Sequence, residues 1–289
     1  MVTRRGVTVV RHDGDGESWT MAHAAPHPVL AGVVARPYCG YVERTAAPFR
    51  RREVATGFVT LILSFSEPLD LVEMSRSSSG GRRFTSFVAG LHEGYAVTEH
   101  GGRQQGVQVD LTPLGAARLL GVPPHAVANA CTGLDDLWGA AAGRLTDRLG
   151  SADGWAARFA ILDDELLARA GDGPDPDPAV AWAWHQLAAS HGQVPVGVLA
   201  DEIGWSRRHF TARFRTQVGL SPKPTARVLR FRRAVNLLRS GPVRSIADLA
   251  AACGYADHSH LVREFRSLGG CTPSDFVRAE LPGSGGTAA

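Results

Sequence analysis

The sequence predicts an α+β protein with a β-rich N-terminal part and an all-helical C-terminal part. Between about residues 29 and 112, six runs of β-branched or aromatic residues alternate with Gly, Pro or Ser clusters. After Pro113, apolar residues recur at helical spacing instead. The segment "GDGPDPDP", residues 171–178, holds three Pro and two Gly and predicts a linker. A chain of 289 residues is long enough for a core on each side of it.

The six runs predict an antiparallel barrel or sandwich, because short strands at regular spacing are typical of those folds. They are "VLAGVV" (29–34), "FVTLILSF" (58–65), "LDLVEM" (69–74), "FTSFVAGL" (84–91), "YAVTEH" (95–100) and "QGVQVDL" (105–111). Residues 1–20 are polar and Gly-rich without a periodic pattern, so we expect them to be disordered. The first domain is therefore expected at 21–170, β-rich to about 112 and helical after it.

The charge of the chain is uneven. Residues 190–289 hold fourteen basic and seven acidic side chains, a net charge of +7, whereas the remainder holds 17 basic and 21 acidic ones, a net charge of −4. A basic domain, expected at 179–289, joined to an acidic one indicates polyanion binding by the C-terminal part.

One pattern occurs twice in this basic part: "LADEIGWSRRHFTARF" (199–214) and "LAAACGYADHSHLVREF" (249–265). In each copy an apolar i, i+4 pair ends a short helix, and Gly with an aromatic residue forms a turn. Ser206 or Asp257 can then cap the next helix. Helix, tight Gly turn and helix is the helix-turn-helix pattern, and its duplication in a basic domain makes the signal specific.

A third helix is expected between the two copies, within residues 223–241, where Pro224 suits a first turn and Gly241 a C-terminal stop. About 16 residues would span about 24 Å and could hold two recognition helices about 34 Å apart, one turn of B-DNA. Of its arginines, Arg230 is as suited to a structural salt bridge as to DNA, while phosphate or solvent is expected for the others, Arg232 among them.

Residues 192–279 resemble the AraC/XylS-type DNA-binding domain. The motifs "S-x-x-H-F-x-x-x-F", "G-x-S-P", "R-x-x-x-A-x-x-L-L", "I-x-x-[LI]-A-x-x-x-G-[FY]", "S-H-[FL]-x-R-x-F" and "T-P-x-x-[FY]" occur here in that order. The resemblance implies a transcription regulator with two helix-turn-helix units joined by a linker helix. It also implies an N-terminal, often cupin-like, barrel that senses an effector or dimerises. Residues 106–127 look like N-terminal halves of actinobacterial regulators of this type.

The same resemblance places the DNA contacts on the second helix of each unit. Arg208 is the strongest candidate, because a guanidinium can bind guanine O6 and N7 together. The DNA-binding residues predicted in this way are Arg207, Arg208, Thr211, Ala212, Arg215, Asp257, His258, Ser259, His260, Val262 and Arg263. Double-stranded DNA is the expected partner, and a small-molecule effector, a homodimer and, for an activator, RNA polymerase are further candidates.

Other chemistry is weakly supported, and we expect no cofactor, metal site or catalytic residue. His258 and His260 would point about 200° apart on a helix and could not converge on one ion. A metal-dependent cupin site would have only His92, Glu93 and His100 as candidate metal ligands in the predicted barrel. The alternative is a DNA-repair-type or cupin enzyme with a DNA-binding tail, but the four scattered cysteines lack a metal-site spacing.

Targeting signals are also missing from the sequence pattern. No run of eighteen apolar residues occurs, and Arg4-Arg5 precedes only a five-residue weakly apolar stretch. The sequence therefore predicts a cytoplasmic protein with reduced thiols.

Overall fold

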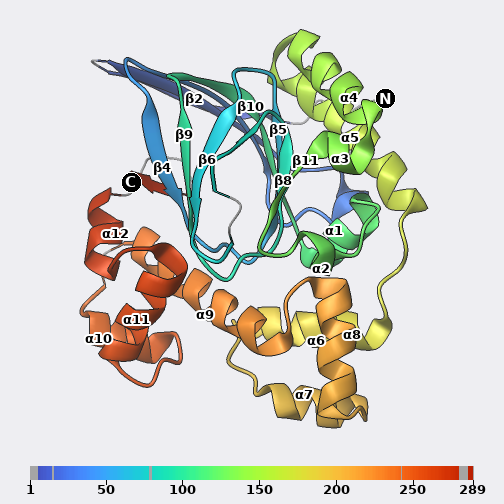
Figure 1. Cartoon of the computed structure of the whole chain (residues 1–289), viewed down its shortest axis with the longest axis vertical. Helices are drawn as coiled ribbons and strands as arrows, with labels where there is room; N and C mark the ends of the chain where they lie inside the picture. The colour runs from blue at the N-terminus through green and yellow to red at the C-terminus, as the bar shows by residue number, and fades with distance from the viewer. Residues whose placement is uncertain (1–5, 15, 78–79, 242, 280–285, 289) are drawn as a thin grey trace.

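A computed structural model describes residues 6–14, 16–77, 80–241, 243–279 and 286–288 (Figure 1). Twelve strands form two antiparallel sheets in this part of the chain, with helices around and below them. The first sheet has the order β1 (Thr8–Gly14), β2 (Glu17–Ala24), β3 (Tyr38–Thr45), β10 (Arg103–Leu111), β5 (Val59–Ser64), β8 (Phe87–Ala89), β11 (Cys131–Gly133). The second has the order β12 (Gly286–Ala288), β4 (Phe49–Glu53), β9 (Ala96–His100), β6 (Leu69–Met74), β7 (Arg82–Phe84).

The first sheet has two chemically different faces, because side chains alternate along a strand. In β5, Val59, Leu61 and Leu63 are fully buried in the main hydrophobic core, whereas Thr60 and Ile62 line a cavity on the other face. In β10, Val107 and Val109 face the core and Gln104, Gln108 and Asp110 face the cavity. The sheet therefore buries its apolar face under helices and turns a more polar face inward.

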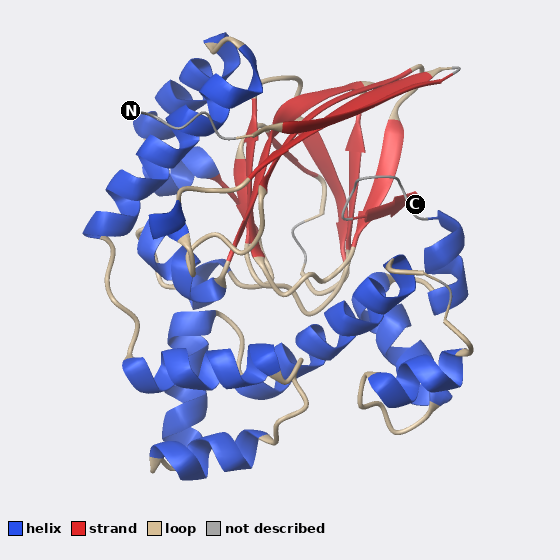
Figure 2. Cartoon of the chain, turned by 180° about the vertical axis from the view of Figure 1, so that it is seen from behind, coloured by secondary structure: helices blue, strands red, loops and turns tan. Residues whose placement is uncertain are grey.

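Five helices follow β10 in the sequence, with β11 between the second and the third. Three of them, α3, α4 and α5, cover the apolar face of the first sheet (Figures 1 and 2). The five helices are α1 (Pro113–Leu119), α2 (Pro124–Val127), α3 (Leu134–Trp138), α4 (Ala140–Ser151) and α5 (Gly154–Asp172). Leu145 and Leu149 of α4 and Leu162 and Leu166 of α5 belong to the same core as β5 and β10. The predicted helices after Pro113 are thus present, with a break between α3 and α4 at Gly139, whose φ is 54°.

Three predictions for the N-terminal part are wrong. The run 84–91 is not one strand: Phe84 ends β7 in the second sheet, and β8 lies in the first sheet. Residues 8–14 and 17–24 form a paired hairpin rather than a disordered end, with Gly16 at φ 89° in its turn. Residues 1–5 lie outside the described part. The run 29–34 is not a strand, because Pro28 begins a short 3-10 helix (Pro28–Leu30), and only isolated bridges at Ala31 and Val34 follow.

The C-terminal part is helical, as predicted, except that residues 286–288 form the strand β12. It consists of α6 (Pro178–Ala189), α7 (Val196–Ile203), α8 (Arg207–Val218), α9 (Pro222–Arg239), α10 (Ile246–Ala252), α11 (His258–Gly269) and α12 (Pro273–Ala279). The predicted linker is shorter than residues 171–178, because α5 ends at Asp172 and Pro178 already begins α6. Asp177 caps α6 and forms an ion pair with Arg213 at 3.2 Å, so the linker is tied to α8. No helix in the described ranges is long and apolar enough to cross a bilayer.

The helical part packs directly against the strands. The Ala55 backbone N–H donates to the Leu268 carbonyl at 3.2 Å, and Gly269 of α11 lies between Phe231 and Val54. At the other end, α1 and α2 contact α8, where Pro124 lies against Gly219. The segment β12 returns from the C-terminal end to pair with β4. One continuous core therefore joins the first sheet to the helices on which the predicted DNA contacts lie.

Candidate functional site

Two helix-turn-helix units lie on either side of α9 (Figure 1). The turn between α7 and α8 has Gly204 at φ 74°, and the turn between α10 and α11 has Gly254 at φ 73°, a conformation that glycine adopts without strain. Ser206 Oγ accepts from the His209 amide at 3.2 Å, and Asp257 Oδ1 accepts from the His260 amide at 2.7 Å. The predicted turns and both predicted helix caps are confirmed.

The second helix of each unit has one buried and one exposed face. Phe210 and Phe214 of α8 and Leu261 and Phe265 of α11 are fully buried. The exposed residues among those predicted to bind DNA are Arg207, Arg208, Thr211, Ala212, Arg215, Asp257, His258, Ser259 and Arg263. His260 and Val262 are partly buried. The structure thus brings these residues together on two solvent-facing surfaces, one per unit.

The two histidines of α11 differ in their surroundings. His260 Nδ1 lies 3.4 Å from the Ala256 amide, and its ring packs edge-on against Tyr255 at 5.2 Å between centroids. His258 is exposed at the first position of the helix. His258 is therefore more accessible than His260 to a ligand that approaches α11 from solvent. In the described residues, no group of three or more His, Cys, Asp or Glu side chains could hold a metal ion.

The sequence predicts phosphate or solvent around Arg227 and Arg232 of α9, but both side chains are engaged within the protein. Arg227 forms a salt bridge with Glu264 of α11, its closest contact being 2.9 Å from Nη2 to Oε1. Arg230 lies over the Tyr255 ring at 5.8 Å. Arg232 stacks on Phe58 at 4.6 Å, and burial lowers its pKa to about 10. The phosphate role expected for Arg232 is wrong, because this side chain is held between α9 and the strands.

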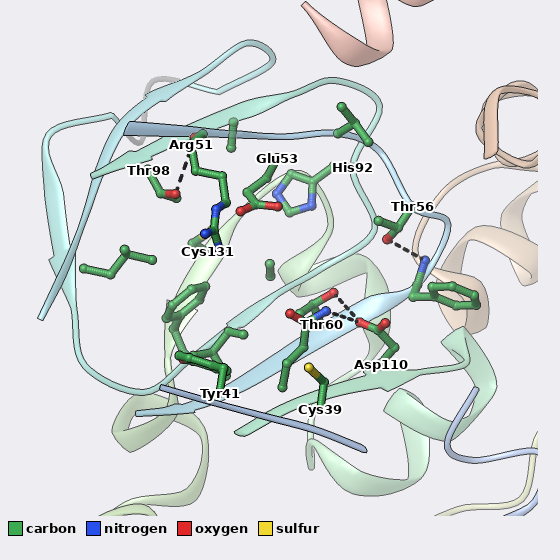
Figure 3. Close-up of a pocket in the computed structure, with 18 of the residues that line it drawn as sticks. Cys39, Tyr41, Arg51, Glu53, Thr56, Thr60, His92, Thr98, Asp110 and Cys131 are labelled. Carbon is green, nitrogen blue, oxygen red and sulfur yellow. Dashed lines mark hydrogen bonds between the residues drawn. The ribbon is translucent and has the colours of Figure 1, made fainter. Parts of the chain in front are cut away.

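A cavity of about 380 Å³ lies between the two sheets (Figure 3). Strands of both sheets line it, and Arg239 at the C-terminal end of α9 also reaches its wall. A volume of this size falls within the range of small-molecule sites in proteins, roughly 300–1,000 Å³. The cavity therefore touches the helix that joins the two helix-turn-helix units.

Two ion pairs occupy the walls of the cavity. Arg51 Nη2 donates to both carboxylate oxygens of Glu43 at 2.9 Å. Arg36 is paired with Asp110, which also accepts from the Thr60 hydroxyl at 3.0 Å (Figure 3). The carboxylates of Glu43 and Asp110 are buried, so each depends on its arginine for compensation, although Arg36 itself is exposed.

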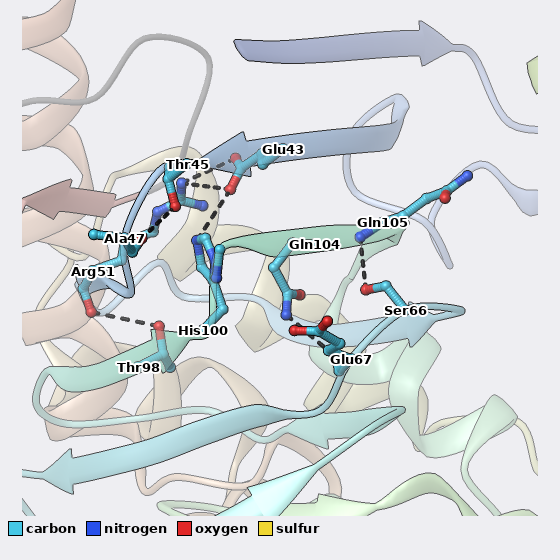
Figure 4. A network of polar contacts seen from close by, with 11 residues as sticks. Glu43, Thr45, Ala47, Arg51, Ser66, Glu67, Thr98, His100, Gln104 and Gln105 are labelled. Atoms are coloured by element: carbon cyan, nitrogen blue, oxygen red, sulfur yellow. Dashed lines mark hydrogen bonds and ion pairs between the residues drawn. The ribbon is translucent and has the colours of Figure 1, made fainter. Parts of the chain in front are cut away.

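A polar network extends from Glu43 toward one end of the sheets (Figure 4). His100 Nε2 lies 3.8 Å from Glu43, and the Gln104 side-chain amide donates to the Glu67 carbonyl at 3.3 Å. Thr98 Oγ1 donates to the Arg51 carbonyl at 3.5 Å. These contacts fix the side chains of β3, β4, β9 and β10 around the cavity.

Burial shifts the pKa values of several groups on the wall. It raises the pKa of Glu53, although Arg51 and Arg239 oppose the shift, and it raises the pKa of Tyr41. Burial also lowers the pKa of His92 to about 4, against a favourable hydrogen bond with the Gly90 backbone. His92 is thus neutral near pH 7, and its Nε2 is buried without a hydrogen-bond partner.

This neutral histidine predicts a specific pH dependence of stability. His92 becomes protonated in the unfolded chain as pH falls below its unfolded-state pKa of about 6.5. In the folded chain the same side chain stays neutral until about pH 4, so protonation favours the unfolded state between these values. The free energy of unfolding should therefore fall by about 2 kcal/mol between pH 7.5 and pH 5 because of this group alone. Urea unfolding of the wild type and His92→Gln across that range measures the effect as a shallower pH slope in the variant. Parallel slopes would contradict the assignment.

The cysteine thiols are not activated. Burial raises the pKa of Cys39 to about 11, of Cys131 to about 12 and of Cys253 to about 11. All four cysteines are free, and a thiol that stays protonated near pH 7 is a poor nucleophile. These environments give no support to a cysteine-dependent repair activity.

The cavity residues were missed because their strands carry charge where a core strand would be apolar. In β4, "FRRRE", Arg51 and Glu53 face the cavity, and in β3 the same is true of Cys39, Tyr41 and Glu43. The period-two alternation of these residues is the signal that could have indicated a polar interior. His92 and His100, expected only as candidates for a metal-dependent cupin, both line the cavity.

Comparison with protein-family models gives two matches. Residues 199–279 match the helix-turn-helix domain family HTH_18, and residues 22–133 match a domain of unknown function, DUF6597. A comparison with curated protein sequences finds no match.

Several solved structures are similar to this chain or to a part of it. The structure of ToxT from Vibrio cholerae shares 11% identity and a TM-score of 0.50, covering 83% of this chain and 98% of that one. ToxT from Vibrio cholerae O395 bound to (E)-4-(8-methylnaphthalen-1-yl)but-3-enoic acid has 10% identity and a TM-score of 0.50, covering 80% and 97%. The DNA-binding domain of AdpA, a global transcriptional factor solved with a target DNA, is 33% identical and covers 35% of this chain and 87% of that one, with a TM-score of 0.31.

The tandem units at 196–269 and the family match define a DNA-binding protein of the helix-turn-helix class. The architecture, an antiparallel β part followed by these helices, is that of ToxT. With the motifs between residues 192 and 279, the family match shows an AraC-type helix-turn-helix domain at residues 199–279.

Proposed function

We propose that this regulator reads two adjacent major-groove segments of DNA with α8 and α11, under the control of a small molecule bound between the two sheets. The observation that carries the DNA part is the exposure of matching faces on both helices, while their opposite faces are buried. Arg208 lies on such a face and makes no ion pair in the described part of the chain. Its guanidinium is therefore free to pair with a guanine.

The rigid connection between the units supports this proposal. With 18 residues, α9 is about 27 Å long. Arg227 pairs with Glu264, so α11 is held on α9 by a salt bridge as well as by the Phe231–Phe265 contact at 4.8 Å. Two recognition helices held on one linker helix can enter two successive major-groove segments on the same side of the DNA.

The effector part of the proposal rests on the cavity and its position. A buried volume of about 380 Å³ with polar groups on its walls is suited to a small organic molecule. Arg239 belongs both to the cavity wall and to α9, so an occupant would contact the helix that carries the DNA-binding units. ToxT, which shares the fold, is known with an organic molecule bound.

Selection of DNA by the full-length chain from a random duplex library tests the proposal. We expect a specific site to be enriched, with two preferred segments about one helical turn apart. Its affinity should fall steeply as salt rises from about 50 to 200 mM, because phosphate contacts release counterions. Enrichment of no sequence over random DNA would contradict it.

The alternative of an enzyme with a DNA-binding tail is not favoured by any observation on the cavity. Its thiols are protonated near pH 7, and its arginines Arg36 and Arg51 are held in ion pairs. A homodimer and RNA polymerase as partners stay predictions from the family resemblance.

A further inference from the structure

The charged side chains on the cavity wall differ in their ion pairs and hydrogen bonds. Arg51 is engaged by Glu43 and Arg36 by Asp110, which leaves both positive groups with an acidic partner. The guanidinium of Arg239 lies over the Phe276 ring at 5.3 Å. Glu53 differs from these residues: within the described ranges its carboxylate accepts no hydrogen bond.

The Glu53 carboxylate is directed into the cavity (Figure 3). Glu53 is the last residue of β4, and β12 pairs with the same strand at this residue, so the backbone there is held in register. Burying an ionised carboxylate that accepts no hydrogen bond is costly, and burial raises the pKa of Glu53 even though the charges of Arg51 and Arg239 partly offset that cost. A positively charged group brought to this position would remove it.

Another part of the wall is apolar. Leu69 and Leu71 of β6 lie there with Phe84 and Phe87, whose rings are 5.4 Å apart. Together with Met74 and Cys131, Leu71 and these rings form a separate small core that borders the cavity. A hydrocarbon or aromatic group could bury its surface against it.

We propose that the effector is a small organic amine, whose ammonium group pairs with Glu53 and whose apolar body packs against Leu71, Phe84 and Phe87. The inference rests on the proposed role of the cavity as the effector site and specifies its ligand class. His92, on the same wall, offers a neutral ring with an unpartnered Nε2 as a further polar neighbour. An ammonium–carboxylate contact in a desolvated site is a charge-assisted hydrogen bond, roughly twice as strong as a neutral one.

Probe molecules that differ only in charge test this class. The full-length protein is titrated calorimetrically with 2-phenylethylamine, 2-phenylethanol and 3-phenylpropionate, and with the three cyclohexyl counterparts. We expect each amine to bind at least about tenfold more tightly than its alcohol, with the carboxylate weakest. The same order should appear as increases in melting temperature, since a ligand that binds only the folded state raises it.

Two variants show whether Glu53 is responsible. Glu53→Gln keeps the size of the side chain and removes its charge, so it should abolish the preference for amine over alcohol while retaining alcohol binding. Glu99→Gln is the matched control, because Glu99 lies on the neighbouring strand β9, is partly exposed and pairs with Arg50 outside the cavity. It removes the same charge and should keep the preference.

Amines that bind no better than the alcohols or carboxylates, or that fail to bind, would overturn the proposal. So would an undiminished preference in Glu53→Gln. The function proposed above fails separately, since DNA selection uses the same protein without these probes. A specific DNA site together with a preference for the carboxylates would retain the regulator and reject only the amine.

Discussion

Phe231→Ala should lower the free energy of unfolding by about 3–5 kcal/mol, the usual cost of emptying a buried aromatic site. Phe231 is fully buried on α9, packs edge-on against Phe265 of α11, and lies next to Gly269, which Val54 also approaches. One ring thus joins the linker helix, the second recognition helix and the end of β4. Its loss should also weaken specific DNA binding, because α11 would lose its position on α9.

Urea unfolding followed by circular dichroism measures this loss. Val277→Ala is the control, because Val277 is 50% exposed on α12 and its truncation should change the unfolding free energy by less than about 0.5 kcal/mol. A loss below about 1 kcal/mol in Phe231→Ala would show that this contact does not hold the units together.

Arg208→Ala should reduce affinity for the selected duplex by about 1–3 kcal/mol, or roughly 5- to 150-fold, and relax base preference at one position. The side chain is exposed on α8 next to the helix N-terminus, where base edges are approached in helix-turn-helix complexes. Fluorescence anisotropy with duplexes substituted at each position measures both effects.

Arg213→Ala is the matched control on the same helix. Arg213 pairs with Asp177 of the linker at 3.2 Å, so its loss should leave base preference unchanged. Equal relaxation of base preference in the two variants would refute the assignment of Arg208. Arg232→Ala, expected from sequence to weaken all duplexes through a lost phosphate contact, should instead act on stability, because Arg232 stacks on Phe58.

The helix-turn-helix units could be predicted from sequence because their signals are local. The Gly204 and Gly254 turns and the Ser206 and Asp257 caps are decided by residues a few positions apart. The inward direction of Phe210 and Phe265 follows from helical spacing alone. The same argument predicted which faces of α8 and α11 are exposed.

The N-terminal strands were harder to predict from the sequence, because a cavity replaces part of the core between the two sheets. In "FRRRE" and "YCGYVERT", alternate residues face a polar interior, so the strands lack the apolar alternation expected when one face is buried. The hairpin at 8–24 is similar, since β1 is exposed along its whole length and is held by pairing with β2. Its stability depends on a distant partner, β3, rather than on local composition.

Tertiary contacts also decided the roles of individual charges. Nothing near Arg232 in sequence indicates that it stacks on Phe58, and nothing near Arg239 indicates that it reaches a cavity between two sheets. In the sequence Glu53 is one charged residue of an arginine-rich strand. In the fold it lies on the wall of the cavity that β3, β9 and β10 also line. The contact of Arg232 with Phe58 joins residues more than a hundred positions apart, and none of these contacts carries a local signal.

We propose that α9 holds the two recognition helices, α8 and α11, as one DNA-reading unit. The most direct measurement is the affinity of the full-length chain for its selected duplex before and after five base pairs are inserted between the two preferred segments. Half a turn moves one segment to the opposite side of the DNA, so affinity should fall to that of random duplex, while an insertion within the flanks should have no effect. Unchanged affinity after the central insertion would contradict the claim.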